Sequence, residues 1–408
     1  MERRIGPRLL LVALVLGSAL AGCDRSSKAT PPPNPTVQVA TSTVTPSPVT
    51  TVAATPPRLY PTPGPPIPTQ GEVRPAGRFL VRKNDGLWIV SLADPAQDRR
   101  IYAASSATPW SFVGAARRGA LTEFFVSERA PQDTLSIVRF DERAQAPERL
   151  FTYGPTRLGE AAVSPNGVSV AYVDDTGLRL RVLPTGADYR VAPHVSWRDR
   201  ACTIVQTCVT HVSPFWSPDG GVLLSRGISY EPVVTWVFDP SQTERPGTRI
   251  PLCLRPAPPW RGSSVPGDDG NCYSDPGRNF FWYDIVTGAK SALPEPSGYE
   301  CSMGGIAARP TGETVTSWVH CKVAGAPYDA PGTDLVVLSR SDGTVLASTR
   351  HFPQPGDAFR AVDWLPDGSG AVLARRSGND DANFLIDRAA QIWTLPLGGA
   401  RLVAILPD

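Results

Sequence analysis

Cysteine is the residue type whose number and spacing most directly suggest chemistry in this sequence. The 408-residue chain has 7 cysteines, six of them in its middle, and only 4 histidines. No Cys-x-x-Cys motif and no histidine cluster with the spacing of metal ligands occurs, so no zinc site is predicted. An even set of six cysteines suits disulfide bonds if the protein is exported. These six are Cys202, Cys208, Cys253, Cys272, Cys301 and Cys321.

Motifs that mark common catalytic centres are absent from the sequence. There is no Gly-x-Ser-x-Gly elbow, no Walker loop and no His-Glu-x-x-His motif. Asp268-Asp269-Gly270 and Asn379-Asp380-Asp381 carry carboxylates that could bind Ca²⁺, but neither completes a calcium-loop motif, and we interpret both as turns. The sequence therefore predicts no catalytic residue, no cofactor and no metal.

The first 23 residues have the pattern of a secretory signal. Basic residues precede an apolar run over residues 9–21, which is too short for a comfortable membrane span. The run ends in Leu20-Ala21-Gly22-Cys23, which resembles the lipobox of bacterial lipoproteins. This resemblance implies removal of residues 1–22 as a signal peptide and a lipid on the thiol of Cys23. We therefore expect an exported protein held at a bacterial cell membrane by acyl chains and facing the periplasm or the cell exterior. An ordinary signal peptide with an accidental cysteine is the alternative.

Residues 23–77 differ in composition from the rest of the chain. Fourteen of the 44 prolines and ten threonines lie between residues 24 and 77. Proline removes an amide donor and fixes φ, so neither a helix nor a sheet is favoured there. We expect a disordered Pro/Thr-rich tether that carries a folded domain over residues 78–408.

The charge balance bears on the class of partner. Removal of residues 1–22 takes away three arginines and one glutamate, which leaves 37 basic and 37 acidic residues. A neutral chain lacks the basic footprint of a nucleic-acid-binding protein, so no nucleic acid is expected as a partner.

From residue 78 onward, short β-branched and aromatic runs alternate with turn residues, and the pattern repeats about every 50 residues. Each repeat contains two runs that would form an outer hairpin of two strands. The seven hairpins are 87–92 with 99–104, 135–141 with 149–153, 178–183 with 189–192, 234–238 with 248–252, 280–285 with 290–293, 335–339 with 344–348, and 391–395 with 401–405.

A Pro-x-Gly turn precedes most of these hairpins. The segments Val163-Ser164-Pro165-Asn166-Gly167, Trp216-Ser217-Pro218-Asp219-Gly220 and Trp364-Leu365-Pro366-Asp367-Gly368 resemble the repeat of TolB-type, WD-repeat-like bacterial propellers. This resemblance covers residues 78–408 and implies an all-β propeller, in which four-stranded blades bury their faces against each other. The chain departs from TolB in having a tether in place of an N-terminal α/β domain, so the partners of that family are not carried over.

Seven outer hairpins predict seven blades, with blade one borrowing an edge from the C-terminal segment. In the fifth repeat the tight turn is expected within 265–277. Six blades with Cys253–Pro294 as one long insertion is the alternative.

The blade arrangement also suggests how the cysteines pair. Cys301 and Cys321 lie ten residues either side of Thr311, the centre of a tight hairpin turn, so they would face each other across two antiparallel strands. Cys202 and Cys208 bracket a short loop, which leaves Cys253 for Cys272.

Connections of unequal length are expected on the two faces of the propeller. Turns between strands 1 and 2 and between strands 3 and 4 are short and share one face, here called the tight-turn face. The long connections 193–211, 253–275, 321–333 and 376–390 are assigned to the other, the long-loop face. Because long loops on a rigid scaffold commonly carry function, we expect ligand contacts there. The candidate ligand-binding residues are Trp197, Arg198, His211, Trp260, Arg261 and Tyr328.

These features favour a non-enzymatic binding or scaffold module for a protein, peptide or glycan of the cell envelope. The alternative is a propeller-fold hydrolase or lyase that acts on polysaccharide with carboxylates near the central channel. A purely structural spacer is a third possibility, and the sequence leaves the oligomeric state open.

Overall fold

The computed structural model describes residues 69–406 apart from 106–107, 144–145, 157–159, 195–208, 229–233, 243–246, 251, 255–259, 270–278, 310, 328–329, 331, 341, 352–357 and 378–379. The described residues form β-strands and one 3-10 helix, η1 (Pro95–Gln97). No helix among them has the length and apolar character needed to cross a membrane.

The described strands form seven four-stranded sheets, each antiparallel throughout. Blade one contains β28 (Arg401–Leu406), β1 (Arg78–Lys83), β2 (Gly86–Ser91) and β3 (Arg99–Ala103). Blade two contains β4 (Trp110–Arg118), β5 (Leu121–Arg129), β6 (Leu135–Asp141) and β7 (Glu148–Tyr153). Blade three contains β8 (Ala161–Val163), β9 (Ser169–Asp174), β10 (Gly177–Val182) and β11 (Asp188–Pro193). Blade four contains β12 (Thr210–Trp216), β13 (Leu223–Ile228), β14 (Val234–Phe238) and β15 (Thr248–Ile250).

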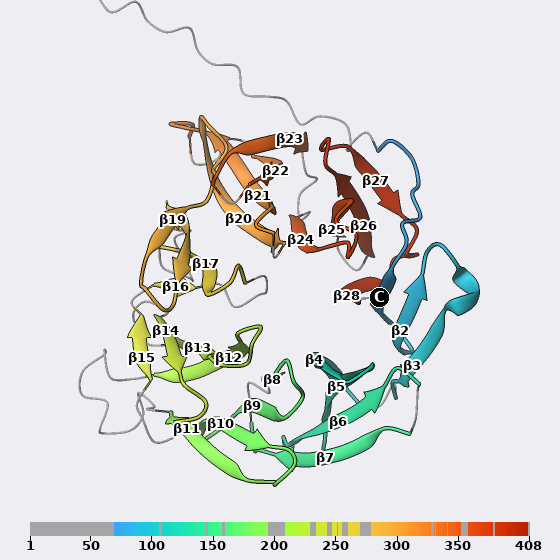
Figure 1. Cartoon of the computed structure of the whole chain (residues 1–408), viewed down its shortest axis with the longest axis vertical. Coiled ribbons are helices and arrows are strands. Elements are labelled where there is room, and N and C mark those ends of the chain that lie inside the picture. Colours follow the sequence, from blue (N-terminus) through green and yellow to red (C-terminus); the bar gives the residue numbers. More distant parts are fainter. Residues whose placement is uncertain are drawn as a thin grey trace, which may run out of the picture. The chain divides into compact units, whose positions relative to one another are not determined.

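The other three blades follow the same order. Blade five contains β16 (Cys253–Leu254), β17 (Ser264–Asp268), β18 (Phe280–Asp284) and β19 (Lys290–Ala292). Blade six contains β20 (Tyr299–Ala308), β21 (Thr314–Val323), β22 (Thr333–Ser339) and β23 (Val345–His351). Blade seven contains β24 (Ala358–Trp364), β25 (Gly370–Ser377), β26 (Asp380–Asp387) and β27 (Ile392–Leu395). The sheets form a ring in which β4, β8, β12, β20, β24 and β28 lie nearest the centre (Figure 1).

The core is divided among the junctions between blades. Seven clusters of buried apolar side chains occur in the described residues, one at each junction between neighbouring blades. Successive side chains of a strand point to opposite faces of the sheet, so one strand contributes to two junctions. Phe79 and Val81 of β1 pack toward blade seven, whereas Leu80 packs toward blade two. The seven-bladed propeller predicted from the sequence is therefore confirmed, and the six-bladed alternative is wrong because β18 and β19 belong to a blade of the ring.

Tryptophans at the ends of two innermost strands join neighbouring blades. The Trp216 indole N–H donates to the Ala162 carbonyl at 3.0 Å, and the Trp364 indole N–H donates to the Ala307 carbonyl at 3.1 Å. Both carbonyls belong to the innermost strand of the preceding blade. Each interaction satisfies a polar atom within an otherwise apolar junction.

The ring closes through the C-terminal strand, which corrects one predicted hairpin. Strand β28 pairs with β1 as the first strand of blade one, whereas β27 is the last strand of blade seven. The predicted pairing of 391–395 with 401–405 is therefore wrong, although the predicted borrowing of a C-terminal edge is confirmed. The outer hairpin of blade seven is β26–β27. It was missed because the acidic segment around Asp380 and Asp381 was interpreted as a turn.

Two other segments differ from the sequence prediction. In blade five, residues 264–268 form the second strand, so the turn between strands 1 and 2 lies before them and not within 265–277. The last part of the expected tether is also ordered. The amide of Val73 donates to the Thr394 carbonyl at 3.0 Å, and the amide of Thr394 donates to the Gly71 carbonyl at 2.8 Å. The described residues 69–77 thus extend along the outer edge of blade seven, and the folded region begins before residue 78.

Candidate functional site

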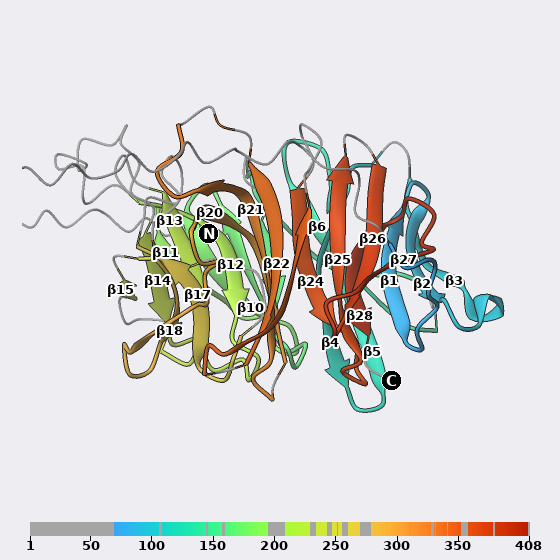
Figure 2. The ribbon, with the colours of Figure 1, turned by 90° about the horizontal axis from the view of Figure 1, so that it is seen from above.

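The two faces of the propeller follow from the antiparallel strand order. Turns between strands 1 and 2 and between strands 3 and 4 emerge on the same side, and the turn between β4 and β5 marks this side at the lower edge of Figure 2. Connections between strands 2 and 3 and crossings between blades emerge on the other side. The described residues of both sides contain candidates for function.

On the long-loop face, a disulfide bond holds the base of the connection between β21 and β22. Cys301 of β20 and Cys321 of β21 are bonded, with their Cα atoms 4.0 Å apart. This pairing confirms the prediction made from their positions around Thr311. The bond fixes the two strands at the point where the chain leaves β21 for the connection to β22.

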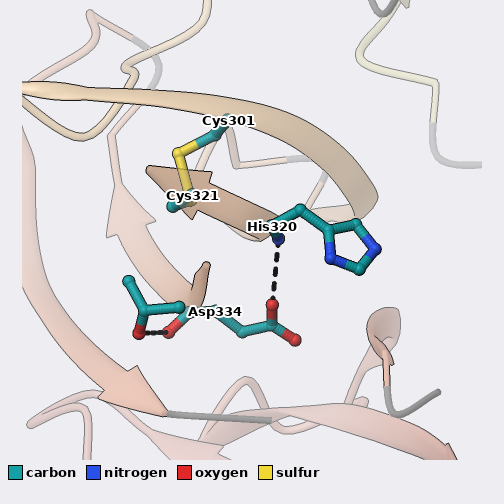
Figure 3. Close-up of a disulfide and its surroundings, with 5 residues drawn as sticks. Cys301, His320, Cys321 and Asp334 are labelled. Carbon is teal, nitrogen blue, oxygen red and sulfur yellow. Dashed lines mark hydrogen bonds between the residues drawn. A yellow bond between two sulfur atoms is a disulfide. The ribbon is translucent and has the colours of Figure 1, made fainter. Parts of the chain in front are cut away.

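His320 lies beside this disulfide and is exposed. Its backbone has φ +54°, a left-handed conformation that is uncommon for histidine, and its amide donates to the buried Asp334 carboxylate at 3.1 Å. Figure 3 shows the imidazole ring of His320 pointing away from both Asp334 and the disulfide. Asp334 therefore holds the backbone in a shape that leaves the ring free to contact a ligand.

A pair of histidines, His194 and His211, lies on the same face, between blades three and four. The His211 amide donates to Nδ1 of His194 at 3.1 Å, and the His211 ring packs edge-on against Trp236 and Phe238. Burial, and then the charge of His194, lower the pKa of His211 to about 4. Because His211 is only 3% exposed, its side chain acts as a core residue in this structure.

Most of the other sequence-predicted residues lie outside the part of the chain that the structure describes. Trp197, Arg198 and Tyr328 lie outside the described residues, as do Cys23, Cys202, Cys208 and Cys272, and of Cys253 only the backbone is described.

Trp260 and Arg261 require a correction. They lie between β16 and β17, which are strands 1 and 2 of blade five, and therefore belong to the tight-turn face and not to the long-loop face. Trp260 packs against Phe215 of blade four, and the Arg261 guanidinium lies 4.9 Å from the centre of the Trp282 ring. The segment 376–390 was also assigned wrongly to the long-loop face, since most of it forms β25 and β26.

On the tight-turn face, a serine that precedes the proline stabilises two of the Pro-x-Gly turns. Ser164 donates to the Asn166 side chain at 2.7 Å and accepts the Ser169 amide at 2.9 Å. Ser217 makes the equivalent bonds with the Asp219 carboxylate and the Val222 amide. In these two blades the turn satisfies its own polar groups.

A pocket of about 300 Å³ opens on this face between blades two and three. Arg118 and Arg139 line it, and each lies 3.6 Å from a carboxylate oxygen of Glu123. Arg139 also contacts Glu148 at 2.5 Å. The two arginines are therefore balanced by two glutamates.

A pocket of about 390 Å³ lies at the corresponding junction between blades six and seven. Arg309 and Glu313 come from the turn between β20 and β21, Arg340 from the turn between β22 and β23, and Arg388 from the turn between β26 and β27. The same Glu313 oxygen accepts from Arg309 at 2.7 Å and from Arg388 at 3.1 Å. Two guanidinium groups thus share one carboxylate oxygen, and a third arginine, Arg340, lines the same pocket.

Sequence reasoning missed this arginine cluster because single charged residues in tight turns are usually solvated. The sequence contains one indication of this cluster. Arg309 precedes the proline of its turn, at the position that Ser164 and Ser217 occupy in their repeats. A long cationic side chain there cannot make the short serine bonds, which suggests another role.

Several solved structures are similar to this chain over most of its length. A prolyl endopeptidase structure is 14% identical, with a TM-score of 0.53, over 81% of this chain and 49% of that chain. TolB from Acinetobacter baumannii is 14% identical over 81% of this chain and 82% of its own, with a TM-score of 0.38. Oligogalacturonate lyase in complex with manganese is 15% identical over 79% and 77% of the two chains, with a TM-score of 0.39.

This chain thus spans about half the length of the prolyl endopeptidase chain. No protein-family model and no curated protein matches the sequence. The chain is a seven-bladed β-propeller with distant structural similarity to a prolyl endopeptidase. At such low identity this likeness describes the fold alone.

Proposed function

We propose that this chain is a TolB-like, lipid-anchored extracytoplasmic propeller that binds a protein, peptide or glycan of the cell envelope without acting on it as an enzyme. The observation that carries the proposal is the Cys301–Cys321 disulfide at the base of the connection between β21 and β22. Disulfides persist in oxidising compartments, which supports the export predicted from the first 23 residues. The bond also reduces the freedom of a connection that would otherwise lose more entropy on contact with a partner.

The arrangement around His320 supports partner binding on the long-loop face. An exposed imidazole on a left-handed backbone, fixed by a buried carboxylate, is a pre-organised contact group. Backbone strain of this kind is retained where the surrounding structure holds it in place, and it is concentrated at functional sites. The predicted contacts Trp197 and Tyr328 lie outside the described residues, in the sequence between β11 and β12 and between β21 and β22.

The face used for binding is tested by capture of partners from cell-envelope extracts. His320→Asn removes the imidazole but keeps a residue that tolerates a left-handed backbone, and we expect it, Trp197→Ala and Tyr328→Ala to weaken capture. Asp342→Ala on the tight-turn face is the matched control and should capture as wild type does. Normal capture by the three long-loop variants together with loss in Asp342→Ala would refute the assignment.

The anchor is tested separately with Cys23→Ala. We expect this variant to lose acyl labelling and to leave the membrane fraction. The control is the double variant Cys301→Ala/Cys321→Ala, which lacks two other cysteines and should keep the label. Unchanged membrane retention of Cys23→Ala would remove the basis for the proposed location.

One observation favours the enzymatic alternative. Asp363 lies in β24, one of the strands nearest the centre, and burial raises its pKa to about 6, the range of a general acid. Its carboxylate accepts the Trp364 amide at 2.8 Å. If the chain cleaves an envelope polysaccharide with this group, release of reducing ends should be lost in Asp363→Asn and retained in Asp381→Asn. Absence of release by wild type on all envelope glycans would reject the alternative.

A further inference from the structure

The pocket between blades six and seven gathers three arginines from three different turns. Arg309, Arg340 and Arg388 line it together with Glu313, so its charged side chains carry a net charge of +2 at neutral pH. Arg388 is held on two sides, because its Nε donates to the Gly368 carbonyl at 3.1 Å and another nitrogen donates to Glu313. Its position is therefore fixed relative to blade six.

Several contacts fix the side chain of Arg309 in place. It is 19% exposed, it bonds Glu313, and its guanidinium lies 5.6 Å from the centre of the Trp364 ring. It also passes so close to Gly368 that a Cβ atom there would lie 2.3 Å from Cζ of Arg309. A guanidinium held by a carboxylate, an indole and a glycine has already lost its side-chain entropy, which lowers the cost of binding a ligand.

Arg340 has no such partner. It is exposed, and no ion pair links it to any residue in the described part of the chain. Asp342 lies in the same turn, but its carboxylate accepts the Thr344 amide at 2.9 Å and is not part of the pocket lining. The Thr344 amide and, to a smaller extent, the Arg340 charge lower the pKa of the Asp342 carboxylate, so Arg340 has an electrostatic neighbour but no ion pair in the described part of the chain.

The corresponding pocket between blades two and three provides an internal comparison. There, Arg118 and Arg139 are balanced by Glu123 and Glu148. Balanced pairs of this kind are what we expect where arginine has a purely structural role at a blade junction. Two arginines and one glutamate line that pocket, a net charge of +1, against +2 for the pocket between blades six and seven, and the larger positive charge raises the local concentration of anions.

We propose that the pocket between blades six and seven binds a tetrahedral oxyanion of the phosphate class, as a free ion or as a phosphomonoester group. Guanidinium forks match the oxygen edges of such an anion, and a charge of about −2 would balance the +2 of the lining. Convergence of donors from three turns favours a tetrahedral anion over a planar carboxylate. The site lies on the face opposite the long loops, so it is separate from the partner-binding site proposed above.

The test is calorimetric titration of the full-length protein in non-ionic detergent at pH 7.5 and constant ionic strength. Inorganic phosphate and glycerol phosphate represent the two sources, sulfate is a second tetrahedral dianion, and acetate is the planar control. We expect the tetrahedral dianions to bind more tightly than acetate. Binding of inorganic phosphate but not glycerol phosphate would assign the site to the free ion, and binding of both would assign it to the monoester group as well.

Three variants separate a built site from general attraction to a basic surface. Arg340→Gln should weaken phosphate binding about tenfold, which corresponds to about 1.4 kcal/mol. Glu313→Gln keeps a polar partner for Arg309 but removes the competing charge, and it should tighten binding roughly threefold. Arg118→Gln, in the balanced pocket, should leave binding unchanged.

The inference is overturned if acetate binds as tightly as phosphate, or if Arg340→Gln and Arg118→Gln weaken binding equally. These outcomes do not affect partner capture by the long-loop face. Conversely, loss of capture in His320→Asn would leave phosphate binding intact, so failure of one proposal is distinguishable from failure of the other.

Discussion

Arg309 of blade six occupies the space that a side chain at Gly368 of blade seven would need. The distance from an ideal Cβ at residue 368 to Cζ of Arg309 is 2.3 Å. The absence of a side chain at residue 368 therefore leaves room for the guanidinium of Arg309, which lies 5.6 Å from the centre of the Trp364 ring. A small residue that is required for the Pro-Asp-Gly turn thus also shapes the pocket.

This relationship predicts that Gly368→Ala lowers the free energy of unfolding for two separate reasons. Its φ of +70° is unfavourable for any residue with a Cβ, at about 1–2 kcal/mol, and displacement of Arg309 adds to that cost. Gly398→Ala is the matched control, because Gly398 has φ +59° and no atom within 4 Å of its Cβ position. Denaturant unfolding should show a larger loss of stability for Gly368→Ala. Equal losses would mean that the contact with Arg309 has no energetic consequence.

The closing strand leads to a second prediction. Leu402 of β28 is 1% exposed in the junction between blades seven and one, and Leu406 of the same strand is 2% exposed in the junction between blades one and two. We expect Leu402→Ala to reduce the free energy of unfolding by about 2–5 kcal/mol because a cavity forms where the ring closes. Val403→Ala, at a partly buried position of the same strand, should cost less. A similar loss for both variants in denaturant titrations would argue against closure of the ring through β28.

The disulfide provides a third prediction. Cys301 and Cys321 are 20 residues apart in sequence, so their bond constrains a short loop of the unfolded chain. We expect the double variant Cys301→Ala/Cys321→Ala to lose about 2–3 kcal/mol of stability in denaturant unfolding. The same loss should appear when wild type is treated with a reductant, and the double variant should not respond to the reductant through this bond. A double variant as stable as wild type would show that strand pairing alone holds β20 against β21.

The sequence predicted the number of blades because each outer hairpin is a local feature. A strand, a short turn and a second strand can be recognised within about 20 residues, and so can a Pro-x-Gly turn. The errors concern relationships between segments. Residues 391–395 and 401–405 are neighbours in the chain but belong to blades seven and one, and nothing local distinguishes this arrangement from a hairpin.

Blade five shows the same limit for the candidate site. The connection before β17 lacks a Pro-x-Gly turn, so Trp260 and Arg261 were assigned to the wrong face. The arginine pocket combines two turns of blade six with one turn of blade seven that lies far from them in the sequence, so no linear motif could predict it. The disulfide between Cys301 and Cys321 was predictable because both cysteines belong to one hairpin.

The last prediction concerns the buried histidine pair and the pH dependence of stability. Burial and the neighbouring His194 lower the pKa of His211 to about 4, whereas an unfolded histidine has a pKa of about 6.5. Between these values the unfolded chain binds a proton that the native protein does not, so acidification from pH 7 to pH 4 favours unfolding. The difference corresponds to about 3 kcal/mol at full effect. Burial also lowers the pKa of His194, which acts in the same direction.

Asp363 contributes with the opposite sign, because its raised pKa of about 6 makes the native protein bind a proton that the unfolded chain releases above pH 4. The total slope of stability against pH is therefore not diagnostic, and the comparison must be made between variants. We expect His211→Gln to lose stability at pH 7, where its native contacts are weakened, but to lose less than wild type on acidification to pH 4.5. Denaturant unfolding at both pH values gives this difference directly. Parallel losses on acidification in the two proteins would mean that His211 is protonated in the native state, which contradicts its burial against Trp236 and Phe238.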